Sequence, residues 1–259
     1  MKLPIFCVAA VVVSLNSFTA AAELATQTGC DPKLVNRAQM VDDIDAAIAN
    51  NQRCLDERLA ELVANEKARG GKAQSKNNLE EPIVGAHLVA KVELLAQKGD
   101  LKSAAVALAD ARMFDQGHEF AAMRWGISGA TLDIAEAYVL EKSGDLRGAL
   151  ATYRSTAKRL QDQGWSGTSS VLIGRMASVA LQLGDKTSAQ QWAESALEVD
   201  PGANSVMGQI SLQNGDKIEA KRYFERSLDL MSEDAQSTNW TLPVFFLELR
   251  SVRIWLAKL

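Results

Sequence analysis

The sequence Gly144-Asp145-Leu146-Arg147-Gly148-Ala149 decides the fold, because its skeleton, Gly-Asp-x-x-x-Ala, occurs four times in the chain. The other copies are Gly99-Asp100…Ala104, Gly184-Asp185…Ala189 and Gly215-Asp216…Ala220. In each copy, an apolar run with helical periodicity precedes the Gly-Asp pair and another follows it. The skeleton therefore predicts the tight turn of a helix hairpin.

Each residue type in the skeleton has a physical role. Glycine adopts the left-handed conformation that ends the first helix, and the aspartate after it caps the second helix. The alanine one turn later faces the first helix, where a small side chain lets the two axes approach closely. The chain is thus predicted to be all-α, with helix pairs at 84–98 and 101–115, 129–143 and 146–162, 168–183 and 186–199, and 202–214 and 217–231.

Two further positions recur around each turn. A mostly small residue lies seven before the glycine, and an apolar or aromatic residue lies four after the alanine: Val92, Ala137, Ala177 and Gly208, then Leu108, Tyr153, Ala193 and Phe224. With this pattern, residues 83–232 resemble tetratricopeptide (TPR) repeats. The resemblance implies a solenoid of antiparallel helix hairpins, preceded here by an N-terminal helical segment. The turn glycines are separated by 45, 40 and 31 residues, so an irregular array is expected.

The resemblance also implies a binding function. In the TPR family, the first helices of successive pairs line a groove that receives a segment of another protein or a peptide. The family's groove positions fall here on Glu93, Tyr138, Glu141, Ser178 and Gln209. This set is mildly acidic, so a partner segment carrying Lys or Arg is expected. Replacing Tyr138 and Glu141 together is expected to weaken partner capture without lowering the melting temperature.

Residues 1–22 have the pattern of a secretory signal peptide, with cleavage expected after Ala22. Lys2 gives a positive start, residues 5–15 are apolar, and three alanines precede the expected cleavage site. Because the leader contains one of the 28 basic residues and no acidic residue, the remaining chain has 27 basic and 32 acidic residues, a net charge of −5. We therefore expect a periplasmic or secreted protein that binds no nucleic acid and has no integral membrane segment after leader removal.

Cys30 and Cys54 remain once Cys7 leaves with the leader. Two cysteines in an oxidising compartment favour one disulfide. However, a helix that starts at Asp31-Pro32 and has no breaker before Gly70 would separate them by roughly 30 Å, whereas a bridge allows about 6 Å between Cα atoms. A bridge is therefore expected to need a break near residues 50–52. An intermolecular bridge and two free thiols are the alternatives.

Three segments flank the repeats. Residues 23–69 form an N-terminal helical segment, in which apolar residues at 34, 41, 48, 55 and 62 leave open either a coiled-coil homo-oligomer or packing on the same chain. Residues 70–82 are polar and rich in Gly and Asn, which predicts a linker. Residues 233–259 contain an apolar helix from Val244 that either caps the last repeat or docks a partner.

No motif in the sequence indicates catalysis, a metal site or a cofactor. The two histidines, His87 and His118, lack metal-ligand spacing, and no phosphate-binding glycine loop is present. The segment from Gly164 to Thr168 departs from a nucleophile elbow, because Thr replaces the last Gly. We therefore expect a non-enzymatic scaffold for cell-envelope or secretion-complex assembly. A cell-wall-acting enzyme with delivery repeats and a structural subunit that oligomerises through residues 32–69 are the alternatives.

Overall fold

The computed structural model describes residues 30, 43–69, 80–118, 128–164, 166–236 and 248–259. Every regular element in these ranges is an α-helix: α3 (Ile44–Arg69), α4 (Glu80–Lys98), α5 (Leu101–His118), α6 (Ser128–Ser143), α7 (Leu146–Asp162), α8 (Ser166–Gln182), α9 (Lys186–Glu194), α10 (Pro201–Gln213), α11 (Lys217–Gln236) and α13 (Glu248–Leu256). The expected leader, 1–22, and residues 70–79 of the expected linker lie outside the described residues. The all-α fold class is confirmed.

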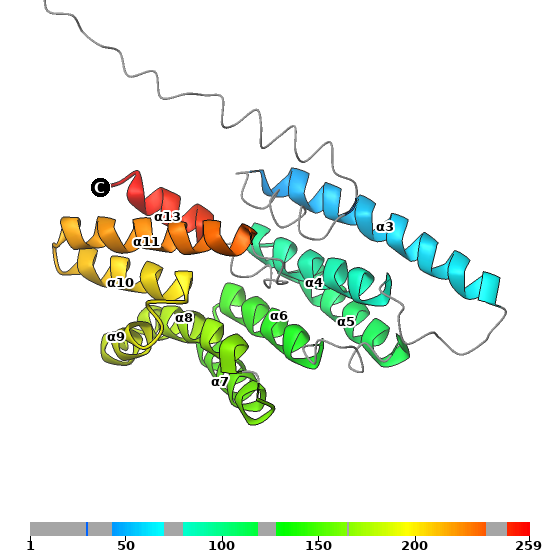
Figure 1. The fold of residues 1–259 in the computed structure, drawn as a ribbon, viewed down its shortest axis with the longest axis horizontal. Helices are drawn as coiled ribbons and strands as arrows, with labels where there is room; N and C mark the ends of the chain where they lie inside the picture. The colour runs from blue at the N-terminus through cyan, green and yellow to red at the C-terminus, as the bar shows by residue number, and fades with distance from the viewer. Residues whose placement is uncertain (1–29, 31–42, 70–79, 119–127, 165, 237–247) are drawn as a thin grey trace, which may run out of the picture.

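Helices α4 to α11 form four antiparallel pairs that stack one after another (Figure 1). Their bounds agree with the four predicted pairs to within a few residues. The largest differences are at α9, which ends at Glu194 and continues as turns, and at α11, which extends to Gln236. First helices pack on one another between pairs, α4 against α6 and α8 against α10, and the side of the array that the first helices line is called the first-helix side.

The four Gly-Asp corners share one geometry. Each glycine has a positive φ, between 82° and 89°, which glycine adopts without the penalty that a Cβ brings. At Gly184, the backbone N–H donates to Leu181 O, and the N–H of Asp185 donates to Ala180 O. The Asp185 carboxylate then accepts from the Ser188 N–H at 3.0 Å. Equivalent caps at Asp100, Asp145 and Asp216 satisfy the otherwise unpaired N–H groups of each second helix.

The corner alanines are fully buried. Ala104, Ala149, Ala189 and Ala220 each have 0% exposure, as their predicted contact with the first helix requires. The closest approach is in the last pair, where a Cβ added to Gly208 would lie 2.6 Å from the Phe224 ring. A glycine at 208 therefore gives α11 room to place a fully buried aromatic ring against α10.

Helix α3 belongs to the same core as the first two repeat pairs. Leu55 and Leu62 are 2% exposed and cluster with apolar residues of α4 to α8. Buried Asn51 joins α3 to α4 by donating to the His87 backbone oxygen at 3.0 Å. Because the heptad face of the described part of the N-terminal segment packs on its own chain, it is not available as a coiled-coil seam. Residues 44–69 are thus continuous with the repeats in packing.

Helix α13 covers the other end of the array. Its Val252 has 0% exposure, and the Trp255 ring stacks parallel to Phe224 with centroids 6.4 Å apart. Together with Ala220 and Met231, these residues form a small separate cluster. Of the two readings of the C-terminal helix, the structure favours the one in which it packs on the last repeat. Residues 237–247, which include the predicted helix start at Val244, lie outside the described residues.

Candidate functional site

Three of the five predicted binding residues come together inside the array. Glu93 of α4 has 0% exposure, and Tyr138 and Glu141 of α6 have 1% and 8%. The Tyr138 hydroxyl donates to Gln97 Oε1 of α4. On the other side, Glu141 contacts α7 and α8. These residues therefore connect successive pairs below the surface of the first-helix side.

Glu141 is the centre of this buried polar cluster. Its Oε2 forms an ion pair with Arg175 of α8, and both side chains are almost fully withdrawn from solvent, at 5% and 4% exposure. The same carboxylate accepts from the Tyr153 hydroxyl at 3.4 Å and from Gln182 Nε2 at 3.2 Å. The Arg175 guanidinium lies over the Tyr138 ring, 5.1 Å from its centroid. A buried carboxylate is tolerated here because a cation and neutral donors surround it.

Both tyrosines in the cluster are held in the neutral form. Burial raises the pKa of Tyr138 well above its usual value, with the nearby positive charge of Arg175 acting in the opposite direction. Burial likewise raises the pKa of Tyr153. A phenol with a raised pKa donates a hydrogen bond across the whole physiological pH range, so these hydroxyls serve as fixed donors. The cluster thus has the properties of a structural connection between repeats.

This burial corrects the expected surface of the first-helix side. In the described conformation, Glu93, Tyr138 and Glu141 cannot contact a partner, because neighbouring pairs cover them. Their negative charge is also inside the array, where Arg175 pairs with Glu141. The expected double substitution of Tyr138 and Glu141 would therefore lower stability, contrary to the sequence-based expectation. Substitutions of Tyr138 and Glu141 are therefore not a test of partner binding.

Ser178 of α8 and Gln209 of α10 remain partly exposed. They occupy the same place in successive pairs, six residues before Gly184 and Gly215 respectively. Leu181 and Leu212, also partly exposed, follow each of them by three residues on the same helices. In each of these two pairs, a partly exposed, uncharged polar residue is therefore followed three residues later by a partly exposed leucine.

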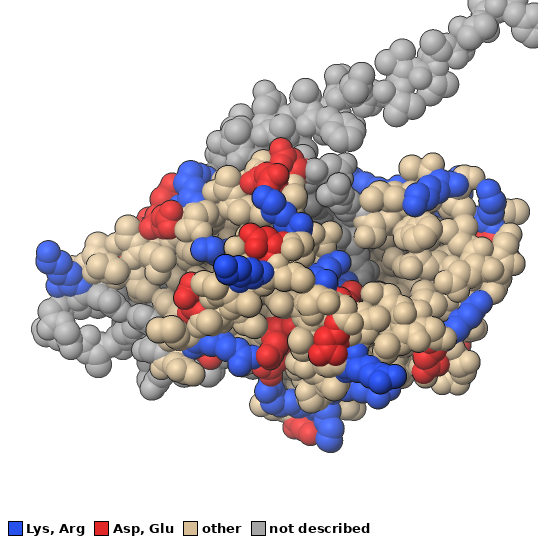
Figure 2. Space-filling view, turned by 180° about the vertical axis from the view of Figure 1, so that it is seen from behind, with Lys and Arg blue, Asp and Glu red and all other residues tan. Residues whose placement is uncertain are grey.

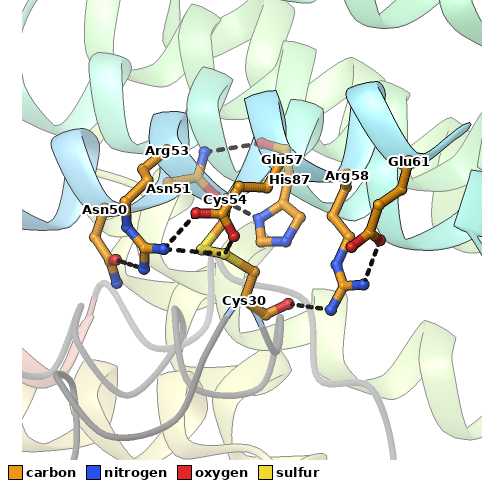
Figure 3. The surroundings of a disulfide bond; sticks show 9 residues. All are labelled: Cys30, Asn50, Asn51, Arg53, Cys54, Glu57, Arg58, Glu61 and His87. Carbon is orange, nitrogen blue, oxygen red and sulfur yellow. Dashed lines mark hydrogen bonds and ion pairs between the residues drawn. A yellow bond between two sulfur atoms is a disulfide. The ribbon is translucent and has the colours of Figure 1, made fainter. Parts of the chain in front are cut away.

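Cys30 and Cys54 form a disulfide with a Cα–Cα distance of 4.9 Å (Figure 3). The break expected near residues 50–52 is absent, because α3 runs through these positions without interruption. Both cysteines are buried, at 5% and 0% exposure. Arg58 of α3 also donates to the Cys30 backbone oxygen at 3.2 Å. Cys30 is therefore fixed to α3 by a covalent bond and by a charge-assisted hydrogen bond.

Comparison with known families adds evidence to this geometry. Residues 172–202 and 203–233 each match the family model of the tetratricopeptide repeat. These two segments are TPR repeats. They comprise most of α8 with α9, and α10 with most of α11. No curated protein and no solved structure matches the chain.

The two TPR repeats include Ser178 and Gln209 at equivalent positions, each six residues after the start of its matched segment. The pairs α4–α5 and α6–α7 have the same Gly-Asp corners with the same φ and caps, although the family model does not extend to them. Their common geometry makes them structural equivalents of the TPR repeats.

Two further observations concern chemistry and membranes. Across the described residues, no three His, Cys, Asp or Glu side chains are grouped as a metal ion would need. Among the helices described above, none has both the length and the apolar character of a membrane span.

Proposed function

We propose that this protein is an exported scaffold that binds another protein or a peptide on its first-helix side, in the assembly of a cell-envelope or secretion complex. The observation that carries the proposal is the pair of TPR repeats at 172–233. Such repeats stack first helices side by side and so present a long surface of regular side-chain spacing. Partner binding is the use that this surface best fits.

The accessible residues of the TPR repeats define the partner's chemistry. Ser178 and Gln209 are uncharged, and partly exposed leucines follow both. On the face of the molecule seen in Figure 2, Lys and Arg lie among Asp and Glu. A partner segment with uncharged polar and apolar side chains therefore fits this surface better than the Lys- or Arg-containing segment expected from the sequence.

Two features support export. The first 22 residues have a leader pattern, and the Cys30–Cys54 disulfide is of the kind that persists in oxidising compartments. Mass spectrometry of the chain recovered from cells tests this part directly. A mature protein that starts at Glu23 and contains no free thiol supports export. A chain that retains residues 1–22 and two reduced cysteines in the cytoplasm contradicts it.

The binding part is tested by cross-linking in intact cells, followed by identification of the captured proteins. The variant Ser178→Arg/Gln209→Arg places two long charged side chains at partly exposed positions of the proposed surface. The control is Gln191→Arg, which adds the same group at an exposed position of α9. We expect the double variant to lose a partner that the wild type and the control both capture. Equal capture by all three proteins would refute binding on this side.

A further inference from the structure

The outer face of α5 is unlike that of every other second helix. α5 packs on α4 and α6, and its opposite side is open to solvent. On that side, Val106 is 58% exposed and Met113 is 71% exposed, and Ala109 is exposed between them. We name Val106, Ala109 and Met113 the α5 stripe. Large apolar side chains at these exposures lose contact with water when another surface covers them.

The repeats themselves provide the comparison that makes the α5 stripe informative. Its residues lie 7, 10 and 14 positions after Gly99. The same positions after Gly144 are Ala151, Arg154 and Lys158, and after Gly215 they are Arg222, Glu225 and Asp229. All of these residues are exposed. The architecture therefore does not require apolar side chains at these positions, and five of the six equivalents are charged.

The spacing of the stripe fits a packed helix pair. Lys102, Val106, Ala109 and Met113 are separated by four, three and four residues, which places them on one line along the helix. This line faces away from buried Ala104 and Ala107. Arg112, beside the line, is held by Glu136 of α6 at 2.6 Å, so it stays on the α6 side of the stripe. A second helix can thus lie along the stripe with knobs-into-holes contacts.

We propose that the α5 stripe binds the α5 stripe of a second copy of this chain, with the two helices antiparallel about a two-fold axis. If the two-fold axis passes between Val106 and Ala109, Val106 of each copy packs against Ala109 of the other. A large side chain then contacts a small one. Lys102 then lies opposite Met113 of the second copy, one turn from its Asp110. Both Lys102 and Asp110 are exposed, and the two-fold axis repeats this charge match at each end.

The proposal is independent of partner binding on the first-helix side, because α5 is a second helix. It also places homo-oligomerisation, for which the sequence offered residues 32–69 as one alternative, on a face that the described residues leave uncovered. A single helix pair buries less than a standard interface, so the dimer is expected to be weak and concentration-dependent.

Sedimentation velocity of the purified full chain over a concentration series tests the proposal. We expect a reversible monomer–dimer equilibrium for the wild type. Val106→Arg should weaken the dimer at least about tenfold, since it introduces two like charges near the axis. Gln191→Arg, which adds arginine at the equivalent exposed position of α9, should leave it unchanged. A wild type that remains monomeric at about 100 µM, or equal dimerisation of both variants, would overturn the proposal.

A charge exchange tests the two-fold pairing itself. Lys102→Glu and Asp110→Lys should each weaken the dimer, because each places like charges together at both ends. The double variant Lys102→Glu/Asp110→Lys should recover most of the loss, because it restores opposite charges in the reverse order. Circular dichroism melting checks that each exposed substitution leaves the fold intact. If the double variant weakens the dimer as much as either single variant does, this antiparallel arrangement is ruled out.

Discussion

Arg175 and Glu141 form an ion pair between α8 and α6 that is almost completely withdrawn from solvent. The pair joins the first TPR repeat, at 172–202, to the helix pair before it, which the family model does not include. Tyr153 and Gln182 donate to the same carboxylate and so fix its orientation. The central part of the array is therefore connected by a polar cluster as well as by apolar packing.

Breaking this ion pair on one side should destabilise the protein strongly. Arg175→Met leaves the Glu141 carboxylate buried without its cation, at an expected cost of about 3–5 kcal/mol in the free energy of unfolding. Urea denaturation measures the loss. The double variant Arg175→Met/Glu141→Gln should be more stable than the single variant, because the Glu141 charge is removed together with the cation that paired with it. A loss under 1 kcal/mol for Arg175→Met would show that the pair is solvated in solution.

The buried corner alanines should not accept larger side chains. Ala149 of α7 has 0% exposure at its contact with α6, so Ala149→Leu forces the two helices apart. We expect a cost of about 1–3 kcal/mol in the free energy of unfolding. Ala151 lies on the exposed side of the same helix, so Ala151→Leu is the matched control and should change stability little. Equal effects of the two substitutions in chemical denaturation would contradict close packing at this corner.

Removing the disulfide should destabilise the N-terminal end of the fold. The bridge joins residues 24 positions apart, and a loop of that length corresponds to about 3–4 kcal/mol in the chain-entropy description. The variant Cys30→Ala/Cys54→Ala should melt at a lower temperature than the oxidised wild type. Dithiothreitol should lower the melting temperature of the wild type and have no effect on the variant. An identical response of both proteins to the reductant would show that the bridge does not form.

Acid should weaken the cap at Asp185. The Ser188 hydroxyl and backbone N–H, which hydrogen-bond to the carboxylate, lower the pKa of Asp185 below 3.8. In acid, the unfolded chain therefore binds more protons at this carboxylate than the folded chain does. The contribution of the cap to the free energy of unfolding is complete above pH 3.8 and is lost as the pH falls through the lowered pKa. Asp185→Asn retains a capping oxygen but cannot titrate.

Urea denaturation at several pH values tests this prediction. Stability of Asp185→Asn should fall less steeply than that of the wild type below pH 3.8. Carbon-detected NMR titration of the wild type should also give a pKa for Asp185 below that value. Parallel stability curves for the two proteins would indicate that the carboxylate makes no net contribution as a cap.

The sequence predicted the helix pairs because their determinants are local. Gly184, Asp185 and Ala189 each act within one turn of their own position, so the residue types alone identified the corner. The same holds for Gly99 and Gly144, where the family model has no match but the φ angles are alike. Local chemistry is therefore sufficient for the arrangement of helices within each pair.

Burial of the predicted binding residues depends on contacts that are distant in the sequence. The register correctly placed Glu141 on a first helix, yet its partner Arg175 comes from the next pair, 34 residues away. From the sequence alone, a carboxylate on a first helix is interpreted as accessible to a partner, because its ion-pair partner in another helix pair is not known. An arginine at the position before Met176, in an otherwise uncharged helix, was the available signal. The disulfide was left open because a helix expected to run unbroken from Asp31 would have held Cys30 and Cys54 too far apart, and residues 31–42 lie outside the described residues.

The stacking of Trp255 on Phe224 limits how copies of this chain can associate. Helix α13 occupies the side of α10 and α11 on which another hairpin would otherwise stack. Head-to-tail addition of a further copy at this end would have to displace it. Filament growth by stacking a further hairpin on this end therefore requires α13 to be released first.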